Sequence, residues 1–495
     1  KMRPGMILFS VVVLFLCAGI LTPKEMLEGF SNKGMITVAL LFLVSEGIRQ
    51  SGTLGQVIKK LLPQGKTTVF KAQLRILPSV AFISAFLNNT PVVVIFAPII
   101  KHWAKSVNLP ATKFLIPLSY VTILGGICTL IGTSTNLVVH GMILEAGFEG
   151  FSMFELGKVG IFIAIAGIIY IFLFSKRLLP DARPDTAVPD EEVEEGEKLH
   201  RVEAVLGARF PGINKKLKDF NFQRHYGAEV KEIKTRNGQR FVTNLDDVVL
   251  HEGDTLVVMA DDTFIPTWGE SSVFVLLTNG NEPDTTGKKK RWFALLLLVL
   301  MIVGATVGEL PVTKEMFPDI KLDMFFFVSI TTIIMAWTNL FPARKYTKYI
   351  SWDILITIAC AFAISKAMVN SGVADSVAKF IIGLSDDYGP HVLLAMVFII
   401  TNLFTELITN NAAAALAFPL ALSISAQLGV SPTPFFVVIC MAASASFSTP
   451  IGYQTNLIVQ GIGNYKFTDF VRIGLPLNII TFLISIILIP LIWNF

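Results

Sequence analysis

The stretch SAFLNNTPVVVIFAP, residues 84–98, places two carboxamides and a hydroxyl in the middle of sequence apolar enough for a lipid bilayer. A second stretch, TELITNNAAAALAFP at residues 405–419, repeats this arrangement at an offset of 321. We call Asn88–Thr90 the first tip and Thr409–Asn411 the second tip. Because polar groups and a following proline recur together, the chain contains an internal two-fold repeat that we expect to determine the fold.

Each tip is followed by a second repeated motif. TLIGTSTNLVVHG, residues 129–141, matches TPIGYQTNLIVQG, residues 449–461, through the pattern T-x-I-G-x-x-T-N-L-x-V-x-G. We call residues 129–136 and 449–456 the first and second T-N loops. Non-helical backbone in a membrane is tolerated only where protein buries it or where it lines a cavity, and transporters use broken helices to bind ligands near the midplane. The alternative is that these polar residues only hold helices together by hydrogen bonds. Two matched pairs of motifs favour one central binding site.

The composition indicates a polytopic membrane protein. Of 495 residues, 53% are hydrophobic and only 16% are charged, whereas soluble domains carry about 25% charged residues. The four cysteines lie in apolar segments at unrelated spacings, which favours neither a disulfide framework nor a zinc site. No phosphate-binding loop or catalytic motif is present, so the sequence predicts that the protein is not an enzyme and binds no nucleic acid.

Apolar segments long enough to cross a bilayer are predicted at residues 6–22, 34–51, 113–145, 157–178, 291–308, 321–340, 350–371, 434–461 and 470–494. We expect residues 113–145 and 434–461 to be discontinuous helices that break at the T-N loops. Residues 73–106 and 391–427 are apolar but interrupted at the tips, which indicates re-entrant hairpins. The predicted fold class is a polytopic α-helical membrane protein with two inverted-topology repeats, re-entrant hairpins, discontinuous helices and a small α+β cytoplasmic domain.

The repeat also organises the domains. Residues 1–180 form the first transmembrane repeat and residues 288–495 the second. The helix at 291–308 opens the second repeat and has no counterpart after Lys1, so we expect the natural protein to have an additional N-terminal helix. Basic residues gather in alternate loops, which by the positive-inside rule places residues 181–290 in the cytoplasm and Phe495 outside. The expected location is the plasma or inner membrane.

The segment between the repeats has a different character. Residues 181–199 include DEEVEEGE and indicate a solvated acidic linker. Residues 200–280 alternate in the manner of short strands. They resemble the TrkA-C domain, also called RCK-C, through L-x-D-F-x-F at 217–222, Y-G-A-x-V at 226–230 and L-x-x-G-D-x-L-x-V from Leu250. That resemblance implies a regulatory domain with a possible small-molecule ligand.

The paired tips and T-N loops resemble the divalent anion sodium symporters, within the ion transporter superfamily. In that family each tip is usually Ser-Asn-Thr, and this chain keeps the central asparagine while both flanking positions vary. The resemblance implies two sodium sites, one at Ser84, Asn88, Asn89 and Gly132 and one at Thr405, Ile408, Asn410 and Gly452. It also implies a substrate site between them, formed by Asn89, Thr90, Thr133, Ser134, Asn410, Asn411, Tyr453 and Gln454.

Helix N-termini bind anions without Arg or Lys. Neutral donors of this kind suit an anion that arrives together with sodium, because the sodium ion brings the positive charge. The large side chains of Asn411 and Tyr453 should shrink the cavity, which favours a compact inorganic dianion, and superfamily members with an inserted TrkA-C domain resemble sulfate transporters. The predicted function is therefore sodium-coupled sulfate symport by an elevator mechanism. The helices at 6–22, 34–51, 291–308, 321–340 and 350–371 are expected to form a static scaffold, and the family resemblance implies that this scaffold forms a homodimer. A sodium/dicarboxylate symporter, with an organic dianion as substrate, is the alternative. A regulated anion conduction pathway or a nutrient sensor also remains open.

Three charged residues in apolar segments allow two interpretations. Glu406 lies four residues before Asn410, and it either couples directly to transport or braces the hairpin. Glu46 and Lys366 occupy equivalent positions in the two repeats. A pseudo-two-fold axis could bring them together as a buried structural pair, although such pairs are weak evidence for stability.

Overall fold

The computed structural model describes residues 4–181, 200–207, 209–235, 239–261, 264, 268, 273–278, 288–317, 319–383 and 389–495. Within these ranges, seven helices are long and apolar enough to cross a membrane, and shorter apolar helices accompany them. The predicted polytopic helical class is confirmed. The predicted acidic linker lies outside the described residues except for Asp181.

Most of the uninterrupted spans begin and end close to the predicted positions. The helices concerned are α3 (Lys33–Gln50), α9 (Gly157–Leu178), α12 (Lys288–Gly308), α14 (Met324–Trp337), α16 (Trp352–Asn370) and α22 (Phe467–Ile492). The first span differs, because α1 (Pro4–Cys17) ends five residues before the predicted boundary. Gly19 is left-handed, with φ +72°, and Thr22 caps a new short helix, α2 (Pro23–Glu28).

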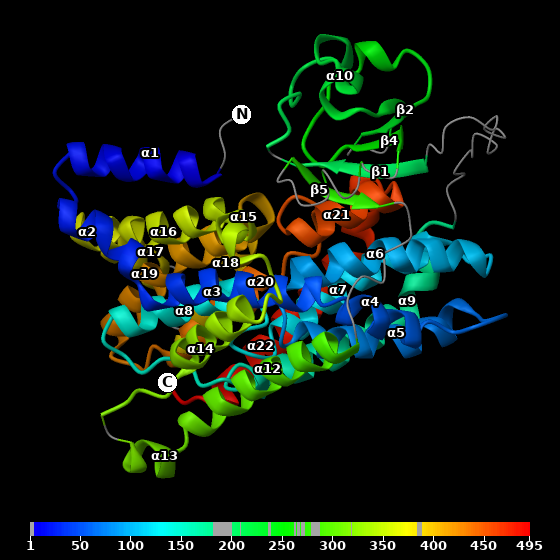
Figure 1. Ribbon diagram of the computed structural model, residues 1–495. Helices are drawn as coiled ribbons and strands as arrows, with labels where there is room; N and C mark the ends of the chain where they lie inside the picture. Colours follow the sequence, from blue (N-terminus) through cyan, green and yellow to red (C-terminus); the bar gives the residue numbers. More distant parts are fainter. Residues whose placement is uncertain are drawn as a thin grey trace, which may run out of the picture.

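Both re-entrant hairpins form, and each turns at its tip (Figure 1). The first consists of α5 (Val69–Ser84) and α6 (Asn89–Ser106), and the second of α18 (Gly389–Leu407) and α19 (Asn410–Leu428). At the first tip the Asn88 side chain accepts a hydrogen bond from the Thr90 amide and caps α6. Asn89 and Asn410 are therefore the first residues of their helices.

Both predicted discontinuous helices are broken at the T-N loops. The first consists of α7 (Leu115–Gly126) and α8 (Ser134–Glu145), and the second of α20 (Thr433–Ser444) and α21 (Gln454–Gly463). A break leaves backbone carbonyls without helical partners, and the loop asparagines bind them. Asn136 Nδ2 donates to the carbonyls of Thr129 (2.9 Å) and Gly126 (3.4 Å). Asn456 Nδ2 donates to those of Ser446 (2.9 Å) and Thr449 (3.1 Å).

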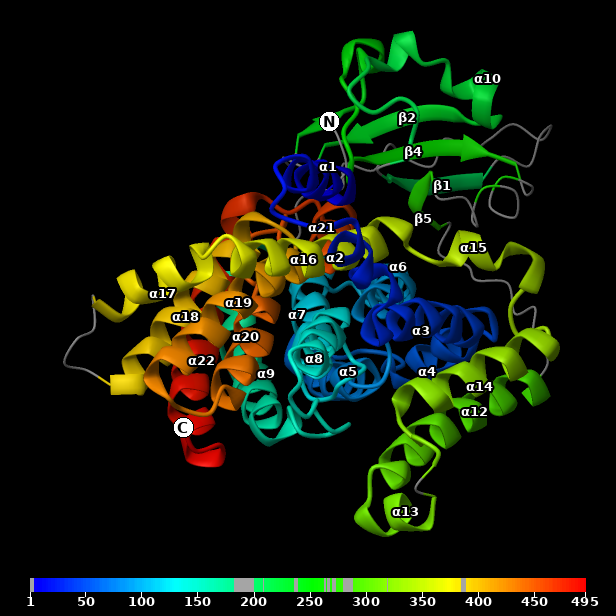
Figure 2. The ribbon, with the colours of Figure 1, turned by 90° about the vertical axis from the view of Figure 1, so that its left-hand side faces the viewer.

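The remaining helices pack around this central part. Helix α1 runs along α16, while α3 and α12 pack on α14, and Figure 2 shows α12 and α14 at the periphery. We call α1, α3, α12, α14 and α16 the scaffold. The scaffold is joined to the hairpins by α4 (Thr53–Leu61) and α17 (Val373–Gly383). The short helices are α13 (Pro311–Met316) and α15 (Tyr346–Tyr349), with 3₁₀ turns at Gly29–Ser31, Ala111–Lys113, Leu217–Asp219, Leu245–Asp247 and Ala343–Lys345.

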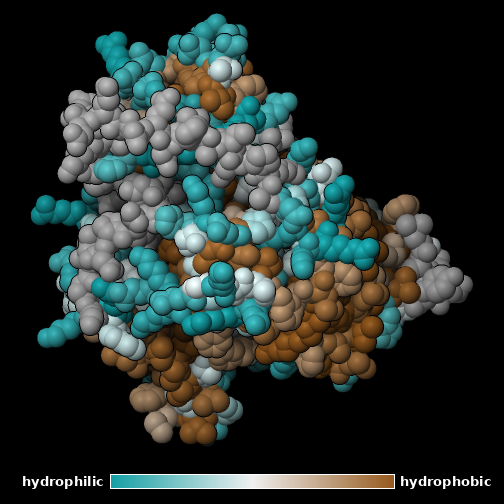
Figure 3. Space-filling view, turned by 90° about the vertical axis from the view of Figure 1, so that its right-hand side faces the viewer, coloured by the Kyte–Doolittle hydropathy of each residue, from teal (hydrophilic) through white to brown (hydrophobic). Residues whose placement is uncertain are grey.

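Residues 200–278 form a small antiparallel sheet, which we call the insert. Its strands are β1 (His200–Leu206), β2 (Glu229–Lys234), β3 (Arg240–Phe241), β4 (Thr255–Ala260) and β5 (Phe274–Thr278), in the order β3-β2-β4-β1-β5. Helix α10 (Phe222–Tyr226) joins an apolar core on one face, which includes Val202 and Ala204 of β1. In the face of the molecule shown in Figure 3, hydrophilic side chains spread across the middle, and hydrophobic ones gather along the lower and right-hand margins.

Replacing Asn136 or Asn456 by alanine should destabilise the protein by about 1–3 kcal/mol each, because buried carbonyls lose their donor. Thermal unfolding in detergent measures the loss. Ser329→Ala is the matched control. The Ser329 hydroxyl donates to the carbonyl of Phe325 (2.6 Å) within the continuous helix α14. In a continuous helix the amide four residues later also donates to this carbonyl, so the carbonyl keeps a donor when the hydroxyl is removed. Equal losses in all three variants would contradict a special role for the loop asparagines.

Candidate functional site

Each tip meets the T-N loop of the opposite repeat. From the first tip, Asn89 Nδ2 donates to the Tyr453 hydroxyl (2.6 Å), and Thr90 Oγ1 donates to Gln454 Oε1 (3.5 Å). Since Asn89 and Thr90 begin α6 while Tyr453 and Gln454 lead into α21, the site joins the amino ends of two helices from different repeats.

The second tip makes the corresponding contacts with the first loop. Asn411 Oδ1 accepts hydrogen bonds from Ser134 Oγ (3.3 Å) and Thr135 Oγ1 (3.1 Å). The bond between Asn411 and Ser134 is the repeat counterpart of that between Thr90 and Gln454. The polar groups of both motif pairs therefore converge on one place, as the sequence predicted.

Tyr453 lies at the centre of this network. Its hydroxyl is 3.0 Å from Thr133 Oγ1, and the side chain of Asn410 lies close to it. Because Thr133 and Tyr453 are equivalent positions in the two repeats, their contact places both residues beside the axis that relates the repeats. Tyr453 is only 8% exposed, so its ring fills space between the two tips.

A cluster of three oxygen atoms lies directly behind the first tip. Ser84 Oγ is 2.7 Å from Asn89 Oδ1 and 2.9 Å from the carbonyl oxygen of Thr122. A hydroxyl has one proton and can donate to only one of these acceptors at a time. Ser84 and Asn89 are fully buried. Neutral oxygens held this close suit a hard cation, which such groups bind through their lone pairs.

The second tip has the same cluster. Thr405 Oγ1 is 2.8 Å from Asn410 Oδ1 and 2.6 Å from the carbonyl oxygen of Ala443. Thr405, Asn410 and Ala443 occupy the positions of Ser84, Asn89 and Thr122 at the offset of 321. The two repeats therefore place equivalent candidate cation sites on either side of Tyr453.

The loop glycines permit this close packing. A Cβ atom at Gly132 would lie 2.5 Å from the carbonyl oxygen of Gly126. At Gly452 it would lie 1.9 Å from Ser446 Oγ and 2.5 Å from the carbonyl oxygen of Thr405. The backbone at Gly132 and Gly452 is thus packed closely against oxygens of the loops and hairpins, although these oxygens are not members of the two clusters.

Most of the predicted site residues come together, and their roles stay predictions. Brought together in the network or directly behind it are Ser84, Asn89, Thr90, Gly132, Thr133, Ser134, Thr405, Asn410, Asn411, Gly452, Tyr453 and Gln454. Asn88 instead caps α6, and with Ser134 it lines a small cavity of about 10 Å³ against α3. Ile408 is 38% exposed at the turn of the second tip.

Sequence reasoning missed several groups at the site. The carbonyls of Thr122 and Ala443 carry no side-chain signal, because their exposure to ligands depends on where α7 and α20 end. Thr135 belongs to the T-N motif and could have been predicted from it. Thr409 Oγ1 is also buried, without a hydrogen-bond partner among the described residues.

The charged residues of the apolar segments have structural contacts. Glu406 Oε1 accepts from the Ser448 amide (2.9 Å) and from Asn478 Nδ2 (2.7 Å), which braces the second loop against α22. The predicted pairing of Glu46 with Lys366 is wrong. Glu46 forms an ion pair with Arg49 at 2.6 Å, and Lys366 is exposed. Arg49 lies one helical turn after Glu46 on α3, so it is nearer to the Glu46 carboxylate than Lys366 of the opposite repeat.

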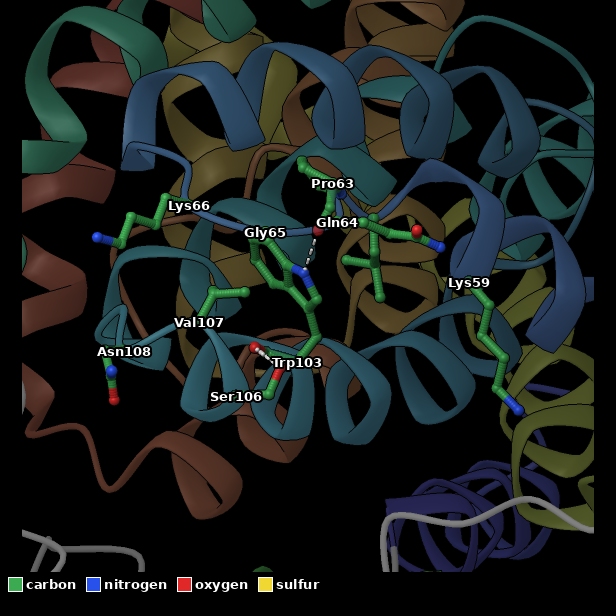
Figure 4. A pocket seen from close by; sticks show the side chains of 10 residues that line it. Lys59, Pro63, Gln64, Gly65, Lys66, Trp103, Ser106, Val107 and Asn108 are labelled. Atoms are coloured by element: carbon green, nitrogen blue, oxygen red, sulfur yellow. Dashed lines mark hydrogen bonds between the residues drawn. The ribbon is translucent and has the colours of Figure 1, made fainter.

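A larger hollow of about 510 Å³ lies away from the tips, between the ends of α4 and α6. Figure 4 shows Lys59 and Lys66 at its margins and the Trp103 indole donating to the Pro63 carbonyl. All of its lining residues come from the segments 59–66 and 103–108. Since neither a tip nor a T-N loop reaches it, this hollow is not the site that the repeats build.

Comparison with known proteins shows which family and which fold this chain is similar to. A profile described as "Citrate transporter" matches residues 1–426 and 312–494. An uncharacterized transporter of Synechocystis sp. is 30% identical over 98% of this chain and 93% of its own length. Sodium/sulfate cotransporter 2 of Chlamydomonas reinhardtii is 31% identical over 57% of this chain and 31% of its own length. The crystal structure of the Alcanivorax borkumensis YdaH transporter, described as having an unusual topology, has 12% identity and a TM-score of 0.56 over 99% of this chain and 98% of its own, which is a likeness of fold alone.

Proposed function

This chain belongs to the citrate transporter family, within the divalent anion sodium symporters, and from that premise we propose that it moves sulfate across the membrane together with sodium. The observation that carries the proposal is the meeting of two carboxamide tips at one tyrosine hydroxyl. Asn89 donates a hydrogen bond to the Tyr453 hydroxyl, and Asn410 lies close to the same hydroxyl, so residues of both repeats line one site.

The charge of the site supports cation coupling. None of the residues predicted to bind the substrate is charged at neutral pH. A dianion brought into a buried site without a counter-charge costs far more free energy than neutral hydrogen bonds return. A cation that enters with the anion removes this penalty. We propose sodium as the coupled ion, because proteins similar to this chain are named sodium/sulfate cotransporters.

The oxygen clusters behind the tips are the proposed sodium sites. Ser84, Asn89 and the carbonyl of Thr122 would bind one ion, and Thr405, Asn410 and the carbonyl of Ala443 the other. Each tip asparagine could then offer its carbonyl oxygen to sodium and its amide nitrogen to the anion. This double use would couple the two cargoes, because either one orients the carboxamide for the other.

The size of the site favours a small tetrahedral anion. Tyr453 occupies the position that Thr133 occupies in the other repeat, and we expect its larger side chain to leave less room for a longer dicarboxylate. A carboxylate is the second candidate substrate, and the description of the matching family as citrate transporters favours it.

Asn89→Ala and Asn410→Ala should each reduce sodium-dependent sulfate uptake at least about tenfold, because each leaves buried partners without a hydrogen bond. Uptake is measured in proteoliposomes with a sodium gradient, with sulfate, succinate, citrate and phosphate in competition. Ser79→Ala is the control, since Ser79 is half-buried on α5 and its hydroxyl donates to the Arg75 carbonyl of the same helix. Undiminished uptake in both asparagine variants would refute the central site, and competition by succinate alone would replace sulfate by a dicarboxylate.

Tyr453→Thr should widen the site and make it more symmetric. Loss of the ring and of its hydrogen bond to Asn89 should raise the KM for sulfate about tenfold, while competition by succinate becomes stronger. Tyr346→Phe, at an exposed tyrosine of α15, is the control. If sulfate and succinate respond to the Tyr453 variant in the same proportion, Tyr453 does not select by size.

We propose that the hairpins and broken helices move past the scaffold as a unit, in an elevator mechanism. The non-helical backbone at the tips and T-N loops could then move from one side of the membrane to the other without contacting lipid. Contact with lipid would cost free energy, because lipid cannot satisfy the hydrogen bonds of the exposed backbone groups. The boundary between the two parts is close where Asn32 Nδ2, before α3, donates to Glu145 Oε2 of α8 at 3.2 Å. A cytoplasmic insert, an external Phe495 and a scaffold-mediated homodimer stay predictions of this arrangement.

A cysteine pair at Asn32 and Glu145 should lock the carrier when it is cross-linked, because that bond joins the scaffold to the moving part. The matched control is a pair at Lys33 and Asp323, which form an ion pair between α3 and α14 inside the scaffold. Its cross-link should leave the uptake rate unchanged. Full uptake by the cross-linked Asn32–Glu145 protein would rule out relative movement at this boundary.

A further inference from the structure

The insert does not stand apart from the transport helices. Its sheet lies over α6 and α21 in both Figure 1 and Figure 2, and β1 packs on α21 while β5 packs on α6. On β1, the side chains of Val202 and Ala204 enter the core of the insert. Val205, which is 1% exposed, instead joins the apolar core of the membrane part. One face of the sheet is therefore a buried interface with the carrier.

A cluster of charges fixes this interface to α6. Lys101 Nζ lies 2.8 and 2.9 Å from the two carboxylate oxygens of Glu203 on β1. Lys234 of β2, only 2% exposed, lies 3.4 Å from the same carboxylate. A bidentate ion pair at a largely desolvated position is far stronger than one at an open surface. Lys101 is thus the attachment point of the insert on the first repeat.

Glu203 keeps its negative charge at neutral pH. Burial alone would raise the pKa of Glu203, but Lys101 and Lys234 lower it to about 2. Because the folded pKa is lowered, the ion pair stabilises docking above the ordinary carboxyl pKa of about 4.5 and is lost only as the pH falls toward 2. Arg201 also acts on Glu203 in the same direction. Protons in the neutral range therefore do not release the insert.

Two glycines fix the interface to α21. Gly253, in the turn before β4, has φ +85°, and a Cβ atom there would lie 3.0 Å from Leu457 Cδ1. A Cβ atom at Gly461 would lie 2.9 Å from Thr255 Oγ1 and 3.0 Å from the carbonyl oxygen of Gly253. The turn and the helix are thus in contact at a distance that side chains would prevent.

These attachment points lie on the two helices that meet at the substrate site. Helix α6 carries Asn89 at its start and Lys101 about 18 Å further along, and α21 starts beside Tyr453 and carries Gly461 about two turns later. The amino ends of both helices are joined by the bond between Asn89 and Tyr453. We propose that the insert is a regulatory clasp that holds α6 against α21, so that release of the clasp changes access to the substrate site.

This inference rests on the proposed function for its effect on transport, but its contacts can be tested without transport. Two reporters are placed separately in a chain whose four cysteines are replaced by alanine. Leu457→Cys lies under Gly253 and reports docking of the insert. Gln454→Cys lies beside Thr90 and reports access to the substrate site. Each reporter is labelled with a maleimide reagent in reconstituted protein.

Lys101→Glu places a negative charge against Glu203. It should speed labelling at Leu457→Cys at least about tenfold, because breaking a buried charge pair weakens an interface by more than this factor. In the Lys101→Glu variant, labelling at Gln454→Cys should also change several-fold. The KM for the transported anion should change several-fold too, when it is measured in Lys101→Glu protein that carries neither reporter. Lys101→Arg keeps the charge and should behave like the parent. Lys105→Glu makes the same charge change at an exposed position one turn further along α6 and should have no effect.

Unchanged labelling at Leu457→Cys in the Lys101→Glu variant would overturn the docking contact. Faster labelling there, with unchanged labelling at Gln454→Cys, would overturn the clasp even though the insert is docked. Absence of sodium-dependent uptake in the parent protein would count against the proposed transport function, and the two labelling rates would still judge the clasp.

Discussion

Two asparagine side chains allow helices to end inside the membrane. Each unsatisfied backbone group in the bilayer core costs several kcal/mol, and the breaks after Gly126 and Ser444 free several carbonyls. Asn136 and Asn456 each donate to two of these carbonyls. These four hydrogen bonds stabilise the ends of α7 and α20, near the carbonyls of Thr122 and Ala443 that belong to the oxygen clusters.

The threonine that opens each T-N motif connects the loop to its hairpin. Thr129 Oγ1 donates to the carbonyl of Ala85, and Thr449 Oγ1 donates to that of Glu406 at 3.1 Å. The same hydroxyls accept hydrogen bonds from the amides of the loop glycines. Tip and loop are therefore one polar unit in each repeat. Under the proposed clasp, a ligand that contacts a tip would act on the loop and, through α21, on the insert.

The repeats are not identical at the centre, and the differences shape the site. Thr133 is small, whereas the hydroxyl of its equivalent Tyr453 accepts a hydrogen bond from Asn89 and lies close to Asn410. The single tyrosine thus makes the cavity asymmetric while the oxygen clusters at Ser84 and Thr405 stay equivalent. In the proposed function, such a carrier would bind two like cations symmetrically and one small anion between them.

Much of this arrangement was determined by the sequence alone. The offsets between the tips and between the T-N loops predicted the hairpins, the broken helices and the convergence of Asn89, Asn410 and Tyr453, because a repeated polar motif in apolar sequence has few tolerated placements in a bilayer. Tertiary structure decided what depends on backbone ends and neighbours. It placed the carbonyls of Thr122 and Ala443 at the site, paired Glu46 with Arg49 rather than Lys366, and set Lys101 against Glu203. Hydrogen bonds and ion pairs act over a few ångströms, and no periodicity in the sequence states which distant groups will come that close.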